Sequence, residues 1–114
     1  MKQVLLIRKD LHMRRGKEIA QGAHASMKAT LENMDDPRVQ TWLSGAFAKI
    51  ALVVESEEEL LDLYAKAKAN GLVTALITDS GKTEFGGVPT NTVVAIGPDE
   101  AEVIDAITGH LKLR

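Results

Sequence analysis

The sequence lacks cysteine and long apolar runs, and it contains few aromatic residues and few prolines. The absence of cysteine excludes disulfides, thiolate catalysis and cysteine-ligated metals. No apolar run approaches the roughly 20 residues that span a membrane, and the run after Met1-Lys2-Gln3 is too short for a signal-peptide core. A hydrophobic content of 45% is typical of a globular domain, here one domain over residues 1–114. We therefore expect a soluble, cytoplasmic protein with no membrane partner.

Charge is distributed unevenly along the chain. Residues 1–30 carry seven lysines and arginines and two acidic residues, a net charge of +5, whereas residues 31–114 carry a net charge of −7. This asymmetry predicts a local site for a polyanion on an otherwise acidic body. A solvated basic loop would produce the same pattern, so charge alone leaves both interpretations open.

Short apolar runs alternate with helical repeats along the chain. Such runs are typical of buried strands, and helices that lie between strands cover the two faces of a sheet. The expected strands are 4–7, 50–54, 73–77 and 92–96. The expected helices are 16–34, 37–44, 57–70 and 97–107. This order predicts an α/β fold, a three-layer α/β/α single domain with a mixed four-stranded sheet.

Capping residues mark several of the helix boundaries. Asp36-Pro37 combines a helix cap with proline at the first helical position. Ser56 and Glu59 have the spacing of a capping box, in which side chains bond the free backbone N–H groups of the first turn. Gly71 is the expected C-terminal stop of the same helix.

Two stripes run along the first helix. Apolar residues that recur every three or four positions predict the face that packs in the core. They are Ile19, Ala20, Ala23, Met27, Leu31 and Met34. A polar stripe lies beside them, at positions i, i+4, i+7 and i+11. Its members are Lys17, Gln21, His24 and Lys28. The polar stripe is either the wall of a site or an ordinary solvated face.

Lys17 favours the first of these interpretations. A cation in the first helical turn opposes the helix dipole at a cost of about a few tenths of a kcal/mol. Exposed backbone N–H groups at a helix start attract anions, and a lysine adds to that attraction. His24 by itself is better explained as a structural histidine with a hydrogen bond than as a catalytic residue. His12 and His110 are too isolated to form a metal set with it, so we expect no metal and no cofactor.

Asp79 follows the third expected strand directly. A carboxylate at this position can face the ligand crevice of an open α/β sheet, although Asp-Ser-Gly is also an ordinary turn signature. The long connection 79–91 and the basic loop 8–16 are expected to meet at the functional edge. Asp79 could orient a water molecule there, and Lys17 or a threonine could stabilise an oxyanion, which suits ester hydrolysis. No serine or cysteine elbow indicates a covalent intermediate.

These residues resemble the motifs of the second peptidyl-tRNA hydrolase family. The N-terminal signature is carried by Arg8, Asp10, Leu11, Met13, Gly16, Lys17, Ala20, Gln21, His24 and Ala25. The second and third signatures are carried by Ile77, Asp79, Gly81 and Thr83, and by Thr92-Val93 with Ile96-Gly97-Pro98. The ending Thr108-Gly109-His110-Leu111-Lys112-Leu113 is also similar. Ser80 and the segments 84–91 and 36–44 depart from the family pattern.

The resemblance implies a homodimeric α/β enzyme that hydrolyses the ester between a peptide and the 3′ end of tRNA without a metal. The catalytic residues that it implies are Lys17, Asp79, Thr83, Thr92 and His24. The substrate-binding residues that we expect on the basic loop and the polar stripe are Arg8, Lys9, Arg14, Arg15, Gln21 and Lys28. The alternatives are a non-catalytic module that binds tRNA, another RNA or a protein, and a dimerising structural protein.

Overall fold

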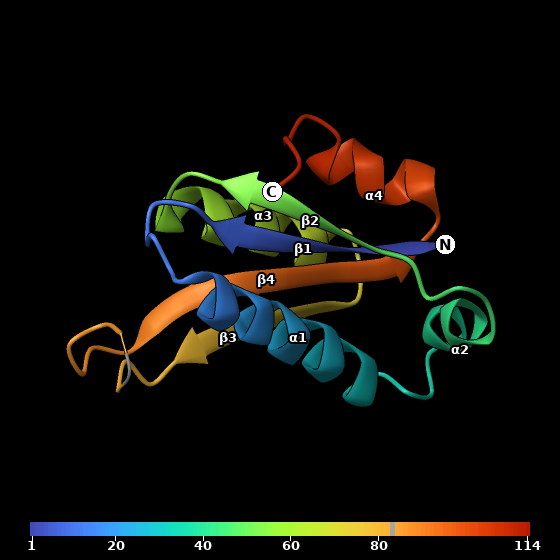
Figure 1. The fold of residues 1–114 in the computed structure, drawn as a ribbon. Helices are drawn as coiled ribbons and strands as arrows, with labels where there is room; N and C mark the ends of the chain where they lie inside the picture. Colours follow the sequence, from blue (N-terminus) through green and yellow to red (C-terminus); the bar gives the residue numbers. More distant parts are fainter. Residues whose placement is uncertain (83) are drawn as a thin grey trace.

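The computed structural model describes residues 1–82 and 84–114, which form a mixed four-stranded sheet with helices packed against it (Figure 1). The strand order is β2-β1-β4-β3, in which β1 is parallel to β2 and antiparallel to β4, and β4 is antiparallel to β3. In chain order the elements are β1 (Lys2–Arg8), α1 (Arg15–Leu31), α2 (Pro37–Ser44), β2 (Lys49–Val54), α3 (Glu57–Ala69), β3 (Thr74–Asp79), β4 (Thr90–Asp99) and α4 (Ala101–Thr108).

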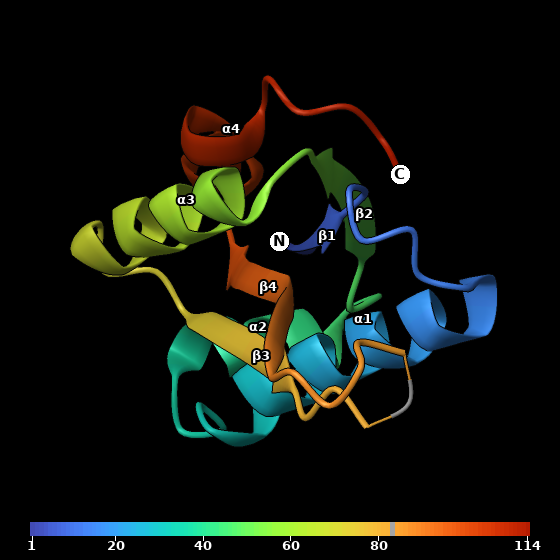
Figure 2. The same cartoon turned by 90° about the vertical axis from the view of Figure 1, so that its left-hand side faces the viewer.

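Helices cover both faces of the sheet, so the predicted three-layer architecture is confirmed. Figure 2 shows α3 and α4 on one side and α1 and α2 on the other. Successive residues of β4 feed two separate apolar cores, because neighbouring side chains in a strand point to opposite faces. Val94 and Ile96 pack under α3 and α4, whereas Val93 and Ala95 pack under α1. None of the helices in residues 1–82 and 84–114 is long and apolar enough to cross a membrane.

The predicted helix caps are present. The Asp36 side chain accepts a hydrogen bond from the Arg38 backbone N–H at 2.8 Å. Ser56 accepts from the Glu59 backbone N–H at 3.0 Å, and the Glu59 carboxylate reaches back to the Glu55 N–H at 2.7 Å. These side chains satisfy backbone donors that have no partner inside the helix. The caps therefore fix where α2 and α3 begin.

The boundary between the last strand and the last helix was predicted wrongly. Residues 97–99 were assigned to the helix, but they extend β4, and α4 begins at Ala101. Sheet hydrogen bonding explains the difference, because the Gly97 N–H donates to the Val73 carbonyl at 2.8 Å and Asp99 pairs with Lys2. Gly97 has a φ of +100°, which glycine adopts readily.

The prediction of the core stripe on α1 was also wrong. Ile19 and Met27 are 66% and 57% exposed, and every other member of the predicted stripe is exposed as well. A face of smaller residues packs on the sheet instead, which lets the helix approach β1 closely. A Cβ atom on Gly22 would lie 3.7 Å from Leu5 Cδ1. The buried residues of α1 are Gln21, Gly22, Ala25, Ala29 and Thr30.

Candidate functional site

The loop after β1, the start of α1 and the loop after β3 meet at one end of the sheet (Figure 1). Arg8 Nη1 donates to the Asn91 carbonyl at 2.9 Å, and Arg14 Nε lies 3.5 Å from Glu84 Oε1. Lys17 Nζ donates to Asp79 Oδ1 at 2.8 Å across the same junction. The prediction that loop 8–16 and loop 79–91 meet is therefore confirmed.

The Lys17–Asp79 ion pair is the centre of this junction. The two side chains are only 14% and 12% exposed, so water screens their attraction weakly. The second carboxylate oxygen of Asp79 accepts the Gly81 backbone N–H at 2.9 Å. The Lys17 hydrogen bond lowers the pKa of Asp79, with further lowering from the Gly81 N–H and smaller contributions from the charges of Lys17 and His24, while burial acts in the opposite direction. Asp79 is therefore an anion at neutral pH.

Two buried polar residues lie behind this ion pair. Thr92 Oγ1 donates to Gln21 Oε1 at 2.5 Å, and the two residues are 0% and 4% exposed. Gln21 Nε2 lies 3.5 Å from Asp79 Oδ1, the oxygen that also accepts from Lys17. The structure therefore brings together four predicted site residues from α1, β3 and β4.

The remaining members of the polar stripe, His24 and Lys28, lie further along α1 than Lys17 and Gln21. His24 is exposed on α1, one turn beyond Gln21, where its charge still reaches Asp79. Lys28 donates to the Leu76 carbonyl of the edge strand β3 at 3.1 Å, further from the ion pair along α1. Thr83, which was predicted to be catalytic, lies outside the described residues.

The predicted phosphate contacts fall into two groups. The Arg8 side chain is 10% exposed, and its Nε and Nη2 donate to the two carboxylate oxygens of Asp10 at 3.1 and 2.7 Å. The same hydrogen bonds lower the pKa of Asp10. Arg8 therefore makes contacts within the chain, to Asp10 and to the Asn91 carbonyl. Lys9, Arg14 and Arg15 are exposed, and the Arg14 side chain is 88% exposed.

The chemistry of the donor set does not resemble a metal site. Within residues 1–82 and 84–114, no cluster of three or more His, Asp or Glu side chains could hold an ion. The carboxylate at the junction already accepts from an ammonium and an N–H group. The arrangement can instead bind and polarise an uncharged ester group, with cations nearby to hold anions.

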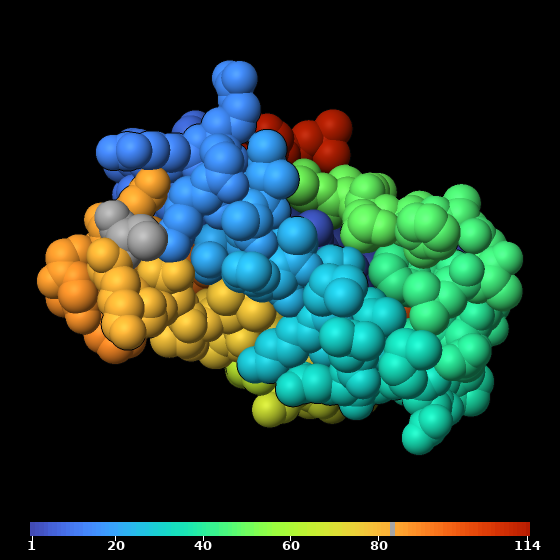
Figure 3. All heavy atoms as spheres, turned by 60° about the horizontal axis from the view of Figure 1, so that its bottom comes forward, coloured from blue at the N-terminus to red at the C-terminus, as the bar shows by residue number. Residues whose placement is uncertain are grey.

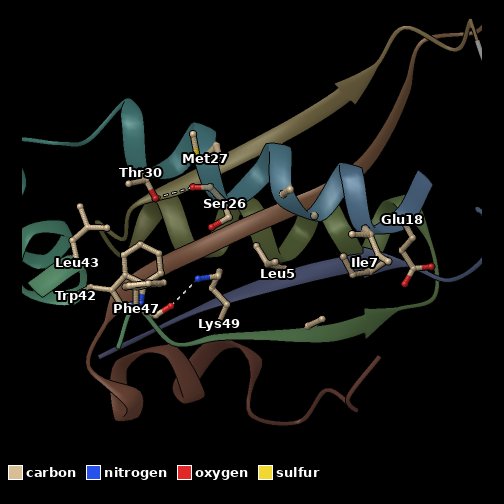
Figure 4. Close-up of a pocket in the computed structure, with 14 residues that line it drawn as sticks. Leu5, Ile7, Glu18, Ser26, Met27, Thr30, Trp42, Leu43, Phe47 and Lys49 are labelled. Atoms are coloured by element: carbon tan, nitrogen blue, oxygen red, sulfur yellow. Dashed lines mark hydrogen bonds between the residues drawn. The ribbon is translucent and has the colours of Figure 1, made fainter. Parts of the chain in front are cut away.

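A second surface feature, which sequence reasoning missed, lies on the other side of α1. Figure 3 shows a hollow between α1 and the segment that leads into β2, and its volume is about 580 Å³. In Figure 4, Leu5 and Ile7 of β1 form its floor, with Trp42 and Phe47 at one end. The exposed Met27 of α1 lies on its wall. We call this hollow the α1 groove. It results from the outward position of the large apolar residues of α1.

The fold and the site define a small α/β protein whose lysine–carboxylate pair lies beside exposed cations, which suits an anionic ester substrate. The chain belongs to the peptidyl-tRNA hydrolase PTH2 family, whose model matches residues 1–114. A peptidyl-tRNA hydrolase of Methanocaldococcus jannaschii is 48% identical over 99% of both chains. A probable peptidyl-tRNA hydrolase 2 of Dictyostelium discoideum is 47% identical over 98% of this chain and 54% of that protein. The family and the names of these relatives indicate peptidyl-tRNA hydrolase activity.

Proposed function

We propose that the chain hydrolyses the ester bond between a peptide and the 3′ end of tRNA. The observation that carries the proposal is the sheltered Lys17–Asp79 pair, assembled from α1 and β3 at the basic edge of the sheet. Family membership supplies the substrate class for this pair. A non-catalytic RNA- or protein-binding module would need the exposed cations but would gain nothing from a carboxylate, which repels phosphate.

Asp79 acts on the attacking water in this proposal. Its lowered pKa keeps it ionised, so its oxygens accept a hydrogen bond from water and orient it toward the ester carbonyl carbon. A carboxylate with a low pKa is a weak base, and positioning is therefore its main contribution. The water oxygen bonds to the carbonyl carbon, the bond to the ribose oxygen breaks, and a proton passes to that oxygen.

Lys17 stabilises negative charge in the same step. The carbonyl oxygen becomes an oxyanion as water attacks, and an ammonium held in a sheltered site stabilises it strongly. Lys9 and Arg14 of the adjoining loop and Arg15 at the start of α1 are exposed and hold the tRNA phosphates, which positions the substrate without reading its sequence. His24 and Thr83 belong to the proposed catalytic set by their family motif, and Lys28 extends the binding surface along α1.

Release of the peptide from purified peptidyl-tRNA tests the proposal. Lys17→Ala and Asp79→Asn should each lower kcat/KM by about 100-fold or more, the effect of removing an oriented group or an oxyanion donor. Lys66→Ala and Asp62→Asn make the same changes on the exposed face of α3 and should leave turnover unchanged. The proposal fails if the wild-type protein has no turnover above background, or if both site variants keep full activity.

We also propose that the reaction needs no metal and takes place in the cytoplasm, where translation produces peptidyl-tRNA. The donor set supports metal independence, because ammonium, hydroxyl and amide groups can supply the required charge stabilisation directly. Turnover that persists after exhaustive treatment with a chelator would support it. Loss of activity that is restored by one added divalent metal would contradict it.

We propose a homodimer that covers the α1 groove. Large apolar patches that remain exposed on a soluble protein mark interaction surfaces. Ile19, Met27 and Leu31 are 66%, 57% and 62% exposed, and Phe47 extends the patch across the groove. Sedimentation should give twice the chain mass of 12.3 kDa for the wild type and the monomer mass for Met27→Glu. Val103→Glu places the same charge on the exposed side of α4 and should remain dimeric. A monomeric wild type would contradict the proposal.

A further inference from the structure

β4 contains an extra residue at Thr92. Ile77 of β3 pairs with Val93, and the next residue, Thr78, pairs with Asn91, so Thr92 has no partner in this ladder. Such a bulge disturbs the alternation of side chains between the two faces of a sheet. Bulges are common beside active sites, where they redirect a side chain. The position of Thr92 is therefore set by the bulge and not by the regular strand pattern.

The direction of the Thr92 side chain shows what the bulge achieves. Val93 lies in the core under α1, so regular alternation would point Thr92 toward α3. Thr92 instead donates to Gln21 of α1 at 2.5 Å. Asn91 takes the opposite direction, and its Nδ2 lies 3.4 Å from Glu57 Oε2 of α3. The extra residue thus places two consecutive side chains, Thr92 and Val93, on the α1 side.

Thr92 and the Asp79 anion together set which end of the Gln21 amide faces Asp79. A hydroxyl that donates to Oε1 leaves Nε2 pointing toward the carboxylate, 3.5 Å from Asp79 Oδ1. The flipped amide would place its own oxygen against a carboxylate anion, which is repulsive. Both residues are buried, so no bulk water competes for these bonds. The contacts therefore run in one donor-to-acceptor direction, in which Thr92 donates to Gln21 and the Gln21 amide nitrogen faces Asp79.

From this geometry we infer that Thr92 and Gln21 are positioning residues, which act as one relay that holds the Asp79 carboxylate against Lys17. Thr92 is 0% exposed and lies behind Gln21, so it acts on the substrate only through its neighbours. Oδ1 of Asp79 accepts from Lys17 Nζ at 2.8 Å and has Gln21 Nε2 3.5 Å away, and Oδ2 accepts from the Gly81 N–H at 2.9 Å. The inference rests on the proposed ester hydrolysis. It means that the bulge in β4 helps to orient the Asp79 carboxylate, which in turn positions the attacking water.

A double-mutant cycle tests whether the two residues form one relay. Thr92→Val and Gln21→Met keep the side-chain volumes and remove the hydrogen bonds, so each should lower kcat by up to about 100-fold while KM stays near its wild-type value. The kcat of the double variant should be no lower than that of either single variant, because either substitution alone already interrupts the chain of hydrogen bonds. Thr92→Ser retains the hydroxyl and should keep most of the wild-type kcat. Thr108→Val, the same change at a buried threonine of α4, should leave kcat unchanged.

A second measurement is independent of turnover. Acid titration of the Asp79 side-chain carboxyl carbon by NMR should show a higher pKa in Thr92→Val and in Gln21→Met than in the wild type, since a donor to the anion is lost. An unchanged pKa of Asp79, losses that multiply in the double variant, or a change in KM alone would overturn the relay. If the wild type has no turnover but the pKa of Asp79 rises in these variants, the proposed function fails and the relay stands.

Discussion

Lys17 Nζ and Asp79 Oδ1 lie 2.8 Å apart although the two residues are separated by 62 positions in the chain. The pair joins the first turn of α1 to the last residue of β3. A cation in the first turn of a helix is unfavourable by itself, and the carboxylate compensates for it. Each of these poorly exposed charges is stabilised by the opposite charge of the other. The contact therefore stabilises the junction of the two loops and forms the site at the same time.

The pair should make stability depend on acid pH in a defined direction. Because the folded pKa of Asp79 is lowered, its contribution to the free energy of unfolding is complete above the unfolded value of about 3.9 and is lost as pH falls through the folded value. The stability difference between wild type and Asp79→Asn should therefore shrink in acid. Thermal unfolding between neutral and strongly acid pH measures it. In a Lys17→Met background most of this pH dependence should disappear, since Lys17 is the main cause of the lowered pKa. A difference that grows in acid would contradict the assignment.

Gly81 should be indispensable for the carboxylate geometry. It has a φ of +82°, and a Cβ atom there would overlap the Val88 backbone. Gly81→Ala should displace the N–H group that binds Asp79 Oδ2 and lower kcat/KM by at least about tenfold, equivalent to about 1.4 kcal/mol. Gly86→Ala is the matched control, because Gly86 also has a positive φ, of +60°, but open space around it. Equal losses in the two variants would show that backbone strain and not the overlap is responsible.

The convergence of Lys17 and Asp79 could be predicted from sequence, since each lies where an α/β sheet presents ligands. The packing of α1 could not. Its sequence contains one stripe of large apolar residues and one of small residues around Gly22, and hydrophobicity alone selects the large stripe. Close approach to β1 requires the small stripe, and this requirement depends on the distance between helix and sheet. The spacing of Gly22, Ala25 and Ala29 was the available signal.

The relay behind Asp79 was also beyond sequence reasoning. Residues 92–96 include four consecutive apolar residues after Thr92, so no alternation marks the face to which each side chain points. A bulge leaves no trace in such a pattern, and the burial of Thr92 depends on it. The motif drew attention to Thr92 and Gln21, and the ladder register shows how a threonine and a glutamine come into contact there.

Arg8 should contribute to stability, while Arg14 and Arg15 should contribute to tRNA binding. Arg8→Gln removes the hydrogen bonds to Asp10 and to the Asn91 carbonyl. It should lower the free energy of unfolding by about 1–3 kcal/mol, a range that allows for the weakening of the ion pair by solvent at the partly exposed Asp10. It should leave the salt dependence of tRNA affinity unchanged. Arg14→Gln and Arg15→Gln should each reduce the slope of log affinity against log salt by about 1 with little effect on melting. A reduced slope in folded Arg8→Gln would show that Arg8 contacts phosphate after all.

Gly22 offers a test of how closely α1 packs on the sheet. Its alanine variant would place a Cβ atom 3.7 Å from Leu5 Cδ1 and 3.9 Å from Ile7 Cδ1, which are ordinary contacts. Gly22→Ala should therefore raise the free energy of unfolding by about 0.5–1 kcal/mol, since alanine loses less conformational freedom in a helix. Gly22→Leu should lower it by about 1–3 kcal/mol, because the larger side chain must displace Leu5 and Ile7 or enter the α1 groove, which Gly22 also lines. Denaturant unfolding measures both, with Gly16→Ala as a control that adds a Cβ atom in open space at the start of α1. A stable leucine variant would mean that the α1 groove accommodates the larger side chain without strain between helix and sheet.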